Sequence, residues 1–181
     1  AKRYQWGLSI ADEEGKVFQQ FEGSGGPPEE ILWSGQNDQD EWIRAGKAYS
    51  PIYMFTLPKG VPATRVGKPL RFKGILHQER TGLHITLDLA ELFGRTKSAE
   101  ALEGDGPNLL RSAVDLIKRN HSGIPIRVEC NAGSKALAEV QCRLLEDYLT
   151  RELMLLAQEI TTDTLQTPYT EQRIEIILLN R

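Results

Sequence analysis

The sequence lacks a long apolar run. No stretch of its 181 residues approaches the roughly 20 consecutive apolar residues that a helix needs to cross a bilayer. The first residues also lack the apolar core of a secretory signal. These absences argue against a membrane-spanning protein. Because residue 1 falls inside a strand-like pattern, we expect an export signal or an anchor to have preceded it.

An excess of positive charge is also missing. The formal net charge is −3, and the lysines and arginines are scattered. The chain therefore has no extended basic surface to displace counterions from a phosphate backbone, and we exclude nucleic acid as a partner. Its 40% apolar and 26% charged residues are typical of a folded protein, which excludes the disordered and collagen-like classes.

Residues for metal, redox or covalent chemistry are few. The two cysteines, Cys130 and Cys142, cannot form a disulfide framework, and they are either buried thiols or a single bridge. His77, His84 and His121 fall in different predicted elements, without an Asp, Glu or Cys at ligand spacing. We therefore predict surface or boundary histidines and no metal site. No nucleophile motif is present, so we predict no catalytic residues, no cofactor and no enzymatic activity.

The N-terminal part reads as short strands. Apolar residues alternate from residue 6 to residue 10, and an Asp-Glu-Glu-Gly turn separates them from a second strand at 17–21, which predicts a hairpin. Further strands are expected at 31–33, 48–55 and 70–76. Gly, Pro and Asp separate these strands, as is typical of an antiparallel β-sandwich.

Beyond residue 82 the apolar period changes from two to 3.6. We predict strands at 84–89, 125–130 and 173–179 and helices at 107–120 and 134–151. The order strand, helix, strand, helix, strand indicates an α+β domain in two layers. A short polar join precedes it, so we divide the chain into domains 1–80 and 81–181.

Two groups of residues invite a functional interpretation that we do not favour. Asp88 and Glu91 could be an acid and base pair, but carboxylates at a strand end are common on solvated edges. Trp33, Trp42 and Tyr49 could form an aromatic ligand platform. We expect them instead to form the core of the first domain, with one exposed ring.

Four segments of the second domain occur in a distinctive order. A strand ending in Leu-Phe covers 85–93, a helix at 109–117 and a strand at 124–128 follow, and residues 172–176 read Gln-Arg-Ile-Glu-Ile. In this order they resemble the OmpA-like domain of outer-membrane proteins, peptidoglycan-associated lipoproteins and flagellar stator subunits. The resemblance implies a βαβαβ fold, the periplasm or outer membrane of a Gram-negative-type bacterium, and peptidoglycan as the default ligand.

The ligand-binding motifs of that family are altered here. Where the family usually has Gly-His-Thr-Asp, residues 129–132 read Glu-Cys-Asn-Ala, and residues 134–142 stand in for its Asn-x-x-Leu-Ser-x-x-Arg-Ala motif. The family's aspartate and arginine hold the charged ends of the diaminopimelate side chain in the peptidoglycan stem peptide. Ala132 and Gln141 occupy those positions in this chain. The polar residues left nearby, which we predict to bind ligand, are Asn131, Ser134 and Arg173.

These substitutions matter because a zwitterionic ligand must exchange its hydration for charge-assisted hydrogen bonds. Removing one partner of a desolvated ionic contact typically costs about 2–5 kcal/mol. Arg143 is two positions from Gln141 and should project from another face of the helix, so we do not expect it to replace the missing arginine.

The first domain carries motifs of its own. An Asp-x-x-Gly turn lies at 12–15, Gly-Pro-Pro at 26–28, Trp-Ser-Gly at 33–35 and Gly-x-x-Tyr at 46–49. In this order they resemble the immunoglobulin-like segment of the flagellar hook-capping protein FlgD and its relatives, in which the third motif is Trp-Asp-Gly. The resemblance implies an immunoglobulin-like β-sandwich that acts as a spacer or binding surface.

Two functions remain open at this point. The first is a periplasmic anchor or scaffold of the OmpA-like family, bound to peptidoglycan. The alternative is a protein–protein interaction module of an envelope or motility assembly that has lost peptidoglycan binding, which the substitutions at Ala132 and Gln141 favour. Leucines near the end of the second helix would form a partner or homodimer contact if they were exposed. They are Leu144, Leu145, Leu149, Leu153, Leu155 and Leu156.

Overall fold

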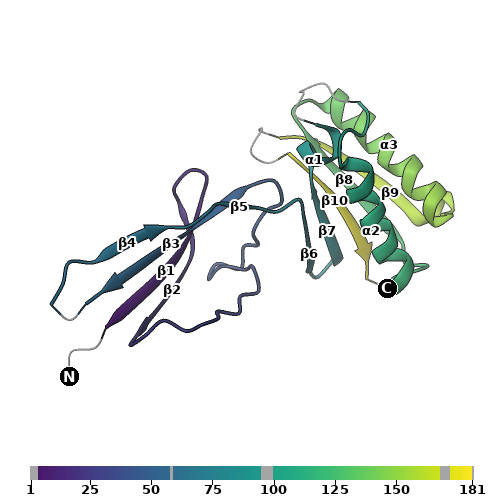
Figure 1. The fold of residues 1–181 in the computed structure, drawn as a ribbon. Coiled ribbons are helices and arrows are strands. Elements are labelled where there is room, and N and C mark those ends of the chain that lie inside the picture. The colour runs from purple at the N-terminus through teal and green to yellow at the C-terminus, as the bar shows by residue number, and fades with distance from the viewer. Residues whose placement is uncertain (1–3, 58, 95–99, 168–171, 181) are drawn as a thin grey trace. The chain divides into compact units, whose positions relative to one another are not determined.

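In a computed structural model the chain divides into two compact units, Ala1–Arg71 and Phe72–Arg181 (Figure 1). The structure describes residues 4–57, 59–94, 100–167 and 172–180. The division falls earlier than the predicted boundary after residue 80, because strand β6 (Gly74–Gln78) pairs with β7 (Gly82–Asp88) of the second unit. The single strand predicted at 70–76 is therefore wrong. The chain bends at Lys73, between β5 (Leu70–Arg71) of the first sheet and β6 of the second.

The first unit contains one antiparallel sheet. Its order is β2-β1-β3-β4, with β5 also paired to β3. The predicted hairpin and the strand at 48–55 are confirmed, and no described residue of this unit is helical. The remaining strands of this sheet are β1 (Gln5–Asp12), β2 (Val17–Ser24), β3 (Ala48–Thr56) and β4 (Ala63–Val66).

The predicted immunoglobulin-like sandwich is not confirmed. The described residues of the first unit form a single sheet, and the segment 31–33 is not a strand. This segment instead packs on the sheet through Trp33, whose ring centroid lies 6.0 Å from that of Phe18 and 6.2 Å from that of Phe21. Phe18 also makes an edge-to-face contact with the buried Tyr49. Aromatic packing against a loop thus takes the place of a second sheet.

The second unit is an α+β domain, as predicted. Its sheet has the order β6-β7-β10-β8-β9, and every neighbouring pair is antiparallel except β8 and β9. Helix α3 (Lys135–Leu153) lies between these two parallel strands in the chain. The strands not yet given bounds are β8 (Ile126–Ala132), β9 (Ile160–Gln166) and β10 (Arg173–Leu179).

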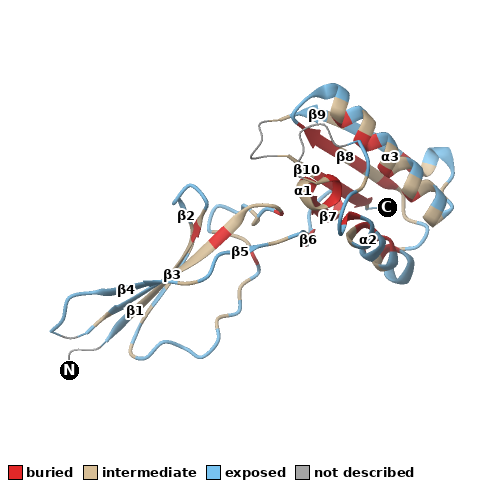
Figure 2. Cartoon of the chain, turned by 45° about the horizontal axis from the view of Figure 1, so that its top comes forward, coloured by how far each residue is buried: buried red, intermediate tan, exposed pale blue. Residues whose placement is uncertain are grey.

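Helices pack against one face of this sheet. The predicted helices are confirmed as α2 (Gly106–Asn120) and α3 (Lys135–Leu153), and the strand predicted at 84–89 gives way to the short helix α1 (Leu89–Phe93). Their apolar faces and the facing side of β7, β8 and β10 form one buried core (Figure 2). A 3₁₀ turn, η1 (Ala157–Glu159), precedes β9. Among the described residues, no helix combines the length and apolarity needed to span a membrane.

Candidate functional site

Two of the predicted ligand-binding residues are neighbours at one end of the second sheet. Asn131 of β8 lies directly opposite Arg173, the first residue of β10. Asp88, the last residue of β7, lies opposite Arg173 on its other side. Directly opposite residues of antiparallel strands project to the same face. Asp88, Arg173 and Asn131 therefore form a row across three strands, which we call the polar row.

The polar row contains a buried acceptor beside a cation. Asn131 is 3% exposed, and its Oδ1 accepts no hydrogen bond from the described residues. Buried polar atoms are nearly always hydrogen-bonded, so this oxygen is a candidate contact for a ligand. The Arg173 side chain is partly exposed, with Nε 3.6 Å from Oε2 of Glu175. The pair can therefore offer an acceptor and a cationic donor to one ligand.

Asp88 is buried, although we expected it to be a solvated carboxylate. It is 3% exposed, and its Oδ1 accepts a hydrogen bond from the backbone N–H of Ala90. It therefore acts as the N-cap of α1. This capping bond satisfies one oxygen of the buried carboxylate at the end of β7.

Ser134 has a structural role at the start of α3. It is exposed, and its Oγ accepts a hydrogen bond from the N–H of Leu137 at 3.1 Å. This bond satisfies one of the first amides of the helix, which otherwise lack a partner. Ser134 comes three residues after Asn131 of the polar row, but its hydroxyl oxygen is already used in this cap.

Ala132 and Gln141, where the resemblance to the OmpA-like domain leads us to expect charged ligand residues, are both buried. Ala132 is 0% exposed and Gln141 is 1% exposed. The Gln172 side chain lies close over Gly133, since a Cβ added there would come within 2.8 Å of its Nε2. Arg143, by contrast, is exposed on another face of α3, as its spacing from Gln141 predicts.

Charged side chains continue along the next row of the sheet. Glu175, Glu129 and Asp163 lie opposite one another on β10, β8 and β9. Arg127 Nε is 3.1 Å from Glu129 Oε1, and an Arg127 terminal nitrogen is 2.8 Å from Asp163 Oδ2. Burial and the charge of Glu175 raise the pKa of Glu129, although Arg127 opposes this shift. Negative charge is therefore concentrated around Glu175.

Two of the three histidines are buried, contrary to the prediction. His77 and His84 are 9% and 6% exposed and lie near Glu175, so the prediction of surface or boundary positions is wrong for both. His121 is partly exposed at the C-terminal end of α2, as predicted. Sequence reasoning missed this group because residues 77–83 were interpreted as a join between domains. The turn itself, Arg80-Thr81, is closed by backbone hydrogen bonds between Glu79 and Gly82, and Gly82 was the one turn residue that could have indicated a hairpin.

Both cysteines are free and buried. Cys130 of β8 and Cys142 of α3 contact each other through a thiol hydrogen bond inside the core, and this bond together with burial raises the pKa of Cys130. Of the two alternatives left open by the sequence, the structure has the buried thiols.

The leucine-rich end of α3 is mostly internal. Leu145 and Leu149 are fully buried, and Leu144, Leu153 and Leu155 pack against the core. Exposed apolar surface remains at Met154 and Leu156. A shallow groove of about 520 Å³ lies beside α3, lined by residues that include Leu102, Arg143, Leu144 and Tyr148.

Comparisons with known proteins identify the fold of the second unit. No family model and no curated protein matches the chain. Among solved structures, an outer membrane protein from Borrelia burgdorferi has a TM-score of 0.50 at 15% identity, covering 59% of this chain and 97% of that one. The cell wall anchor of the T6SS from Pseudomonas aeruginosa has a TM-score of 0.51 at 13% identity, with coverages of 60% and 89%.

The periplasmic domain of Helicobacter pylori MotB is similar to the same extent, with a TM-score of 0.50, 14% identity and coverages of 59% and 79%. These similarities fit the C-terminal part of the chain and give no support to a FlgD-like first domain. At such low identities the likeness concerns the fold alone. The second unit, Phe72–Arg181, has the OmpA-like fold.

Proposed function

We propose that this protein is a non-enzymatic anchor or scaffold of the bacterial cell envelope, located in the periplasm or at the outer membrane, with peptidoglycan as its ligand. The fold of the second unit carries the proposal. Similar structures include an outer membrane protein, a cell wall anchor and a periplasmic domain. The order of sequence segments that resembles the OmpA-like domain supports the same assignment.

The polar row suits the zwitterionic end of a diaminopimelate side chain. The guanidinium of Arg173 can donate charge-assisted hydrogen bonds to a carboxylate, and Oδ1 of Asn131 can accept one from an ammonium group. In this proposal Arg173 and Asn131 bind the ligand in place of the charged pair that the family usually has where this chain has Ala132 and Gln141. Ser134, at the positive end of α3, would line the same site.

A second candidate function is a protein–protein interaction module that has lost peptidoglycan binding. The residues Ala132 and Gln141 favour it, because both are buried and neither carries a charge that could hold a zwitterionic ligand. The groove on α3 and the exposed Met154 and Leu156 would then contact an envelope protein or a second copy of the chain.

Binding to insoluble peptidoglycan sacculi tests the first function. The unmodified chain should co-sediment with sacculi, and free diaminopimelate should compete. Arg173→Ala should weaken binding by about 2–5 kcal/mol because it removes the cation from the polar row. The matched control is Arg143→Ala, an exposed arginine of the same unit outside the polar row, and it should bind normally.

Absence of binding by the unmodified chain would reject the anchor and leave the interaction module. The pair Ala132→Asp and Gln141→Arg restores the residues usual in the family, but both positions are buried, so circular dichroism must first show that the variant is folded. Analytical ultracentrifugation of the unmodified chain would then measure its mass in solution and decide between a homodimer and a separate partner.

A further inference from the structure

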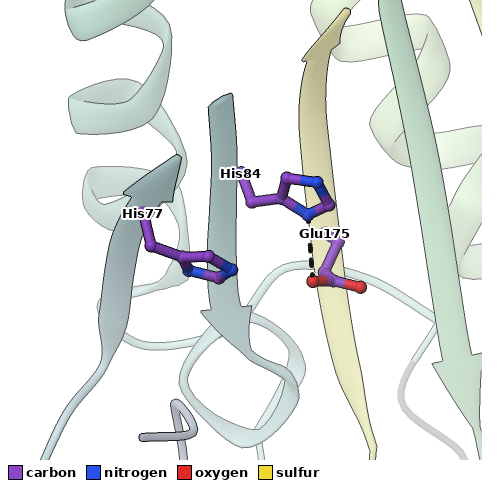
Figure 3. Close-up of side chains that lie close together, drawn as sticks. All are labelled: His77, His84 and Glu175. Carbon is purple, nitrogen blue, oxygen red and sulfur yellow. Dashed lines mark hydrogen bonds and ion pairs between the residues drawn. The ribbon is translucent and has the colours of Figure 1, made fainter. Parts of the chain in front are cut away.

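Three potential metal ligands from three different strands meet on the second sheet. His77 of β6 lies directly opposite His84 of β7, and Glu175 of the neighbouring strand β10 reaches His84 from the other side. One ligand atom from each residue lies within 4.8 Å of the other two. Figure 3 shows the two imidazole rings side by side, with the Glu175 carboxylate directed at Nδ1 of His84. The rings stack at 5.3 Å between centroids.

Hydrogen bonds hold these side chains in place. The Thr81 hydroxyl lies 2.6 Å from Nε2 of His84, and Oε2 of Glu79 lies 3.3 Å from the same nitrogen. Nδ1, the other ring nitrogen of His84, lies 3.4 Å from Oε1 of Glu175. Thr86 donates to that oxygen in turn. An imidazole oriented by outer hydrogen bonds toward a second ligand is the usual arrangement at metal sites.

A carboxylate from the hairpin turn completes the group. Oε1 of Glu79 lies 3.0 Å from Nε2 of His77, so this side chain contacts both histidines. It is 41% exposed, whereas the histidine side chains are 7% exposed. Glu79 is therefore placed between the buried imidazoles and solvent, where it orients both rings through their Nε2 atoms.

The geometry points to a binding site for a divalent transition metal, with His77, His84 and Glu175 as ligands. Two imidazoles and a carboxylate suit Zn²⁺, which binds nitrogen and oxygen at about 2.0–2.2 Å in tetrahedral sites. Ligand atoms in such a site lie about 3.3 Å apart, so atoms that now lie within 4.8 Å of one another must move closer, and the stacked rings must turn, when the ion binds. A cation there would also offset the negative charge that Glu175 and Glu129 concentrate on this face. The ion would tie the β6–β7 hairpin to the central strand β10.

Calorimetric titration of the 181-residue chain with ZnCl₂, after treatment with a chelator, tests the site. We expect one ion per chain and a higher melting temperature with zinc. His77→Ala, His84→Ala and Glu175→Gln should each weaken zinc binding at least tenfold. His121→Ala is the matched control, since it removes the remaining histidine, at the end of α2, and should bind zinc as the unmodified chain does.

The visible absorption of Co²⁺ gives a second measurement that does not depend on variants. Bound cobalt in a site of nitrogen and oxygen ligands should produce d–d bands that zinc displaces. If the unmodified chain binds neither ion at the stated stoichiometry, the cluster is a metal-free network of histidine and glutamate side chains. If His121→Ala lowers affinity as much as His84→Ala, the ion is held elsewhere. Neither result depends on whether the protein binds peptidoglycan.

Discussion

Asp12 organises the turn between β1 and β2. Its Oδ1 accepts hydrogen bonds from the backbone N–H groups of Glu14 and Lys16, both at 3.0 Å, and Lys47 Nζ lies 3.3 Å from its Oδ2. Burial alone would raise the pKa of Asp12. The two backbone bonds and the Lys47 charge outweigh it and hold the pKa below its ordinary value. The charged form is thus the one that the fold stabilises.

Replacing this carboxylate should destabilise the first unit in a pH-dependent way. We expect Asp12→Ala to lower the free energy of unfolding by about 1–3 kcal/mol at neutral pH, since it removes two hydrogen bonds to a charged group. Because the folded-state pKa is lowered, the contribution of the charge is complete above the unfolded-state pKa of about 3.9. It is lost as the pH falls through the folded-state value, so the difference between variant and unmodified chain should shrink in acid.

Urea titrations followed by tryptophan fluorescence at neutral and acid pH measure this effect. All three tryptophans lie in the first unit, so the signal reports on its unfolding. Glu14→Ala in the same turn is the control, because its side chain is exposed. An equal loss from Glu14→Ala, or a difference that does not change with pH, would contradict the role assigned to Asp12.

At the residue scale the sequence predicted only part of the candidate site. The resemblance to the OmpA-like domain pointed to Asn131 and Arg173, and strand pairing places them side by side. The sequence could not predict the cluster of His77, His84 and Glu175. Glu175 lies 91 positions from His84 in the chain, and only the sheet order β6-β7-β10 brings the two together.

At the scale of elements, β7 requires a glycine at its start. Gly82 has φ +147°, a conformation that other residues rarely adopt, and a Cβ there would collide with the carbonyl group of Leu178 on β10. Gly82→Ala should therefore destabilise the second unit by about 2–4 kcal/mol through backbone strain and overpacking. Far-UV circular dichroism during thermal unfolding measures this loss of stability, because the helices of the described chain all lie in this unit.

Gly74→Ala on the neighbouring strand is the control for this variant. Its added Cβ would meet chiefly a methyl group of Leu87, at 3.1 Å, and that side chain can shift. We expect a loss of about 1 kcal/mol or less. If the two alanine variants were equally stable, the backbone of β7 would not require glycine at position 82.

Elements were predictable where apolar periodicity was strong. The stripe of α2 at Leu110, Ala113, Val114 and Ile117 packs into the core as expected. Strand β9 was missed because its sequence, Ile-Thr-Thr-Asp-Thr-Leu-Gln, has only two apolar residues, five positions apart, and no alternation. It is an edge strand specified by parallel pairing with β8, and that long-range contact leaves no local pattern.

At the scale of the whole molecule, the division between the two units determines which fragment can fold. Residues 70–76 have the composition of one strand, but the structure shares them between two sheets. A fragment covering 72–181 keeps β6, including its five pairings with β7 and His77. A fragment covering 81–181, the domain predicted from sequence, exposes the hydrogen-bonding edge of β7 and removes one proposed metal ligand.

We therefore expect the 72–181 fragment to unfold cooperatively and the 81–181 fragment to be less stable by about 2 kcal/mol or more, because the backbone groups of β7 lose their partners. Chemical unfolding followed by circular dichroism compares the two fragments directly. Repeating the comparison with zinc separates the contribution of strand β6 from that of the bound ion. The ion should stabilise only the longer fragment, since binding energy is added to the fold only where His77, His84 and Glu175 are all present. Equal stability of the fragments without zinc would mean that β6 is dispensable and that the unit begins after residue 80.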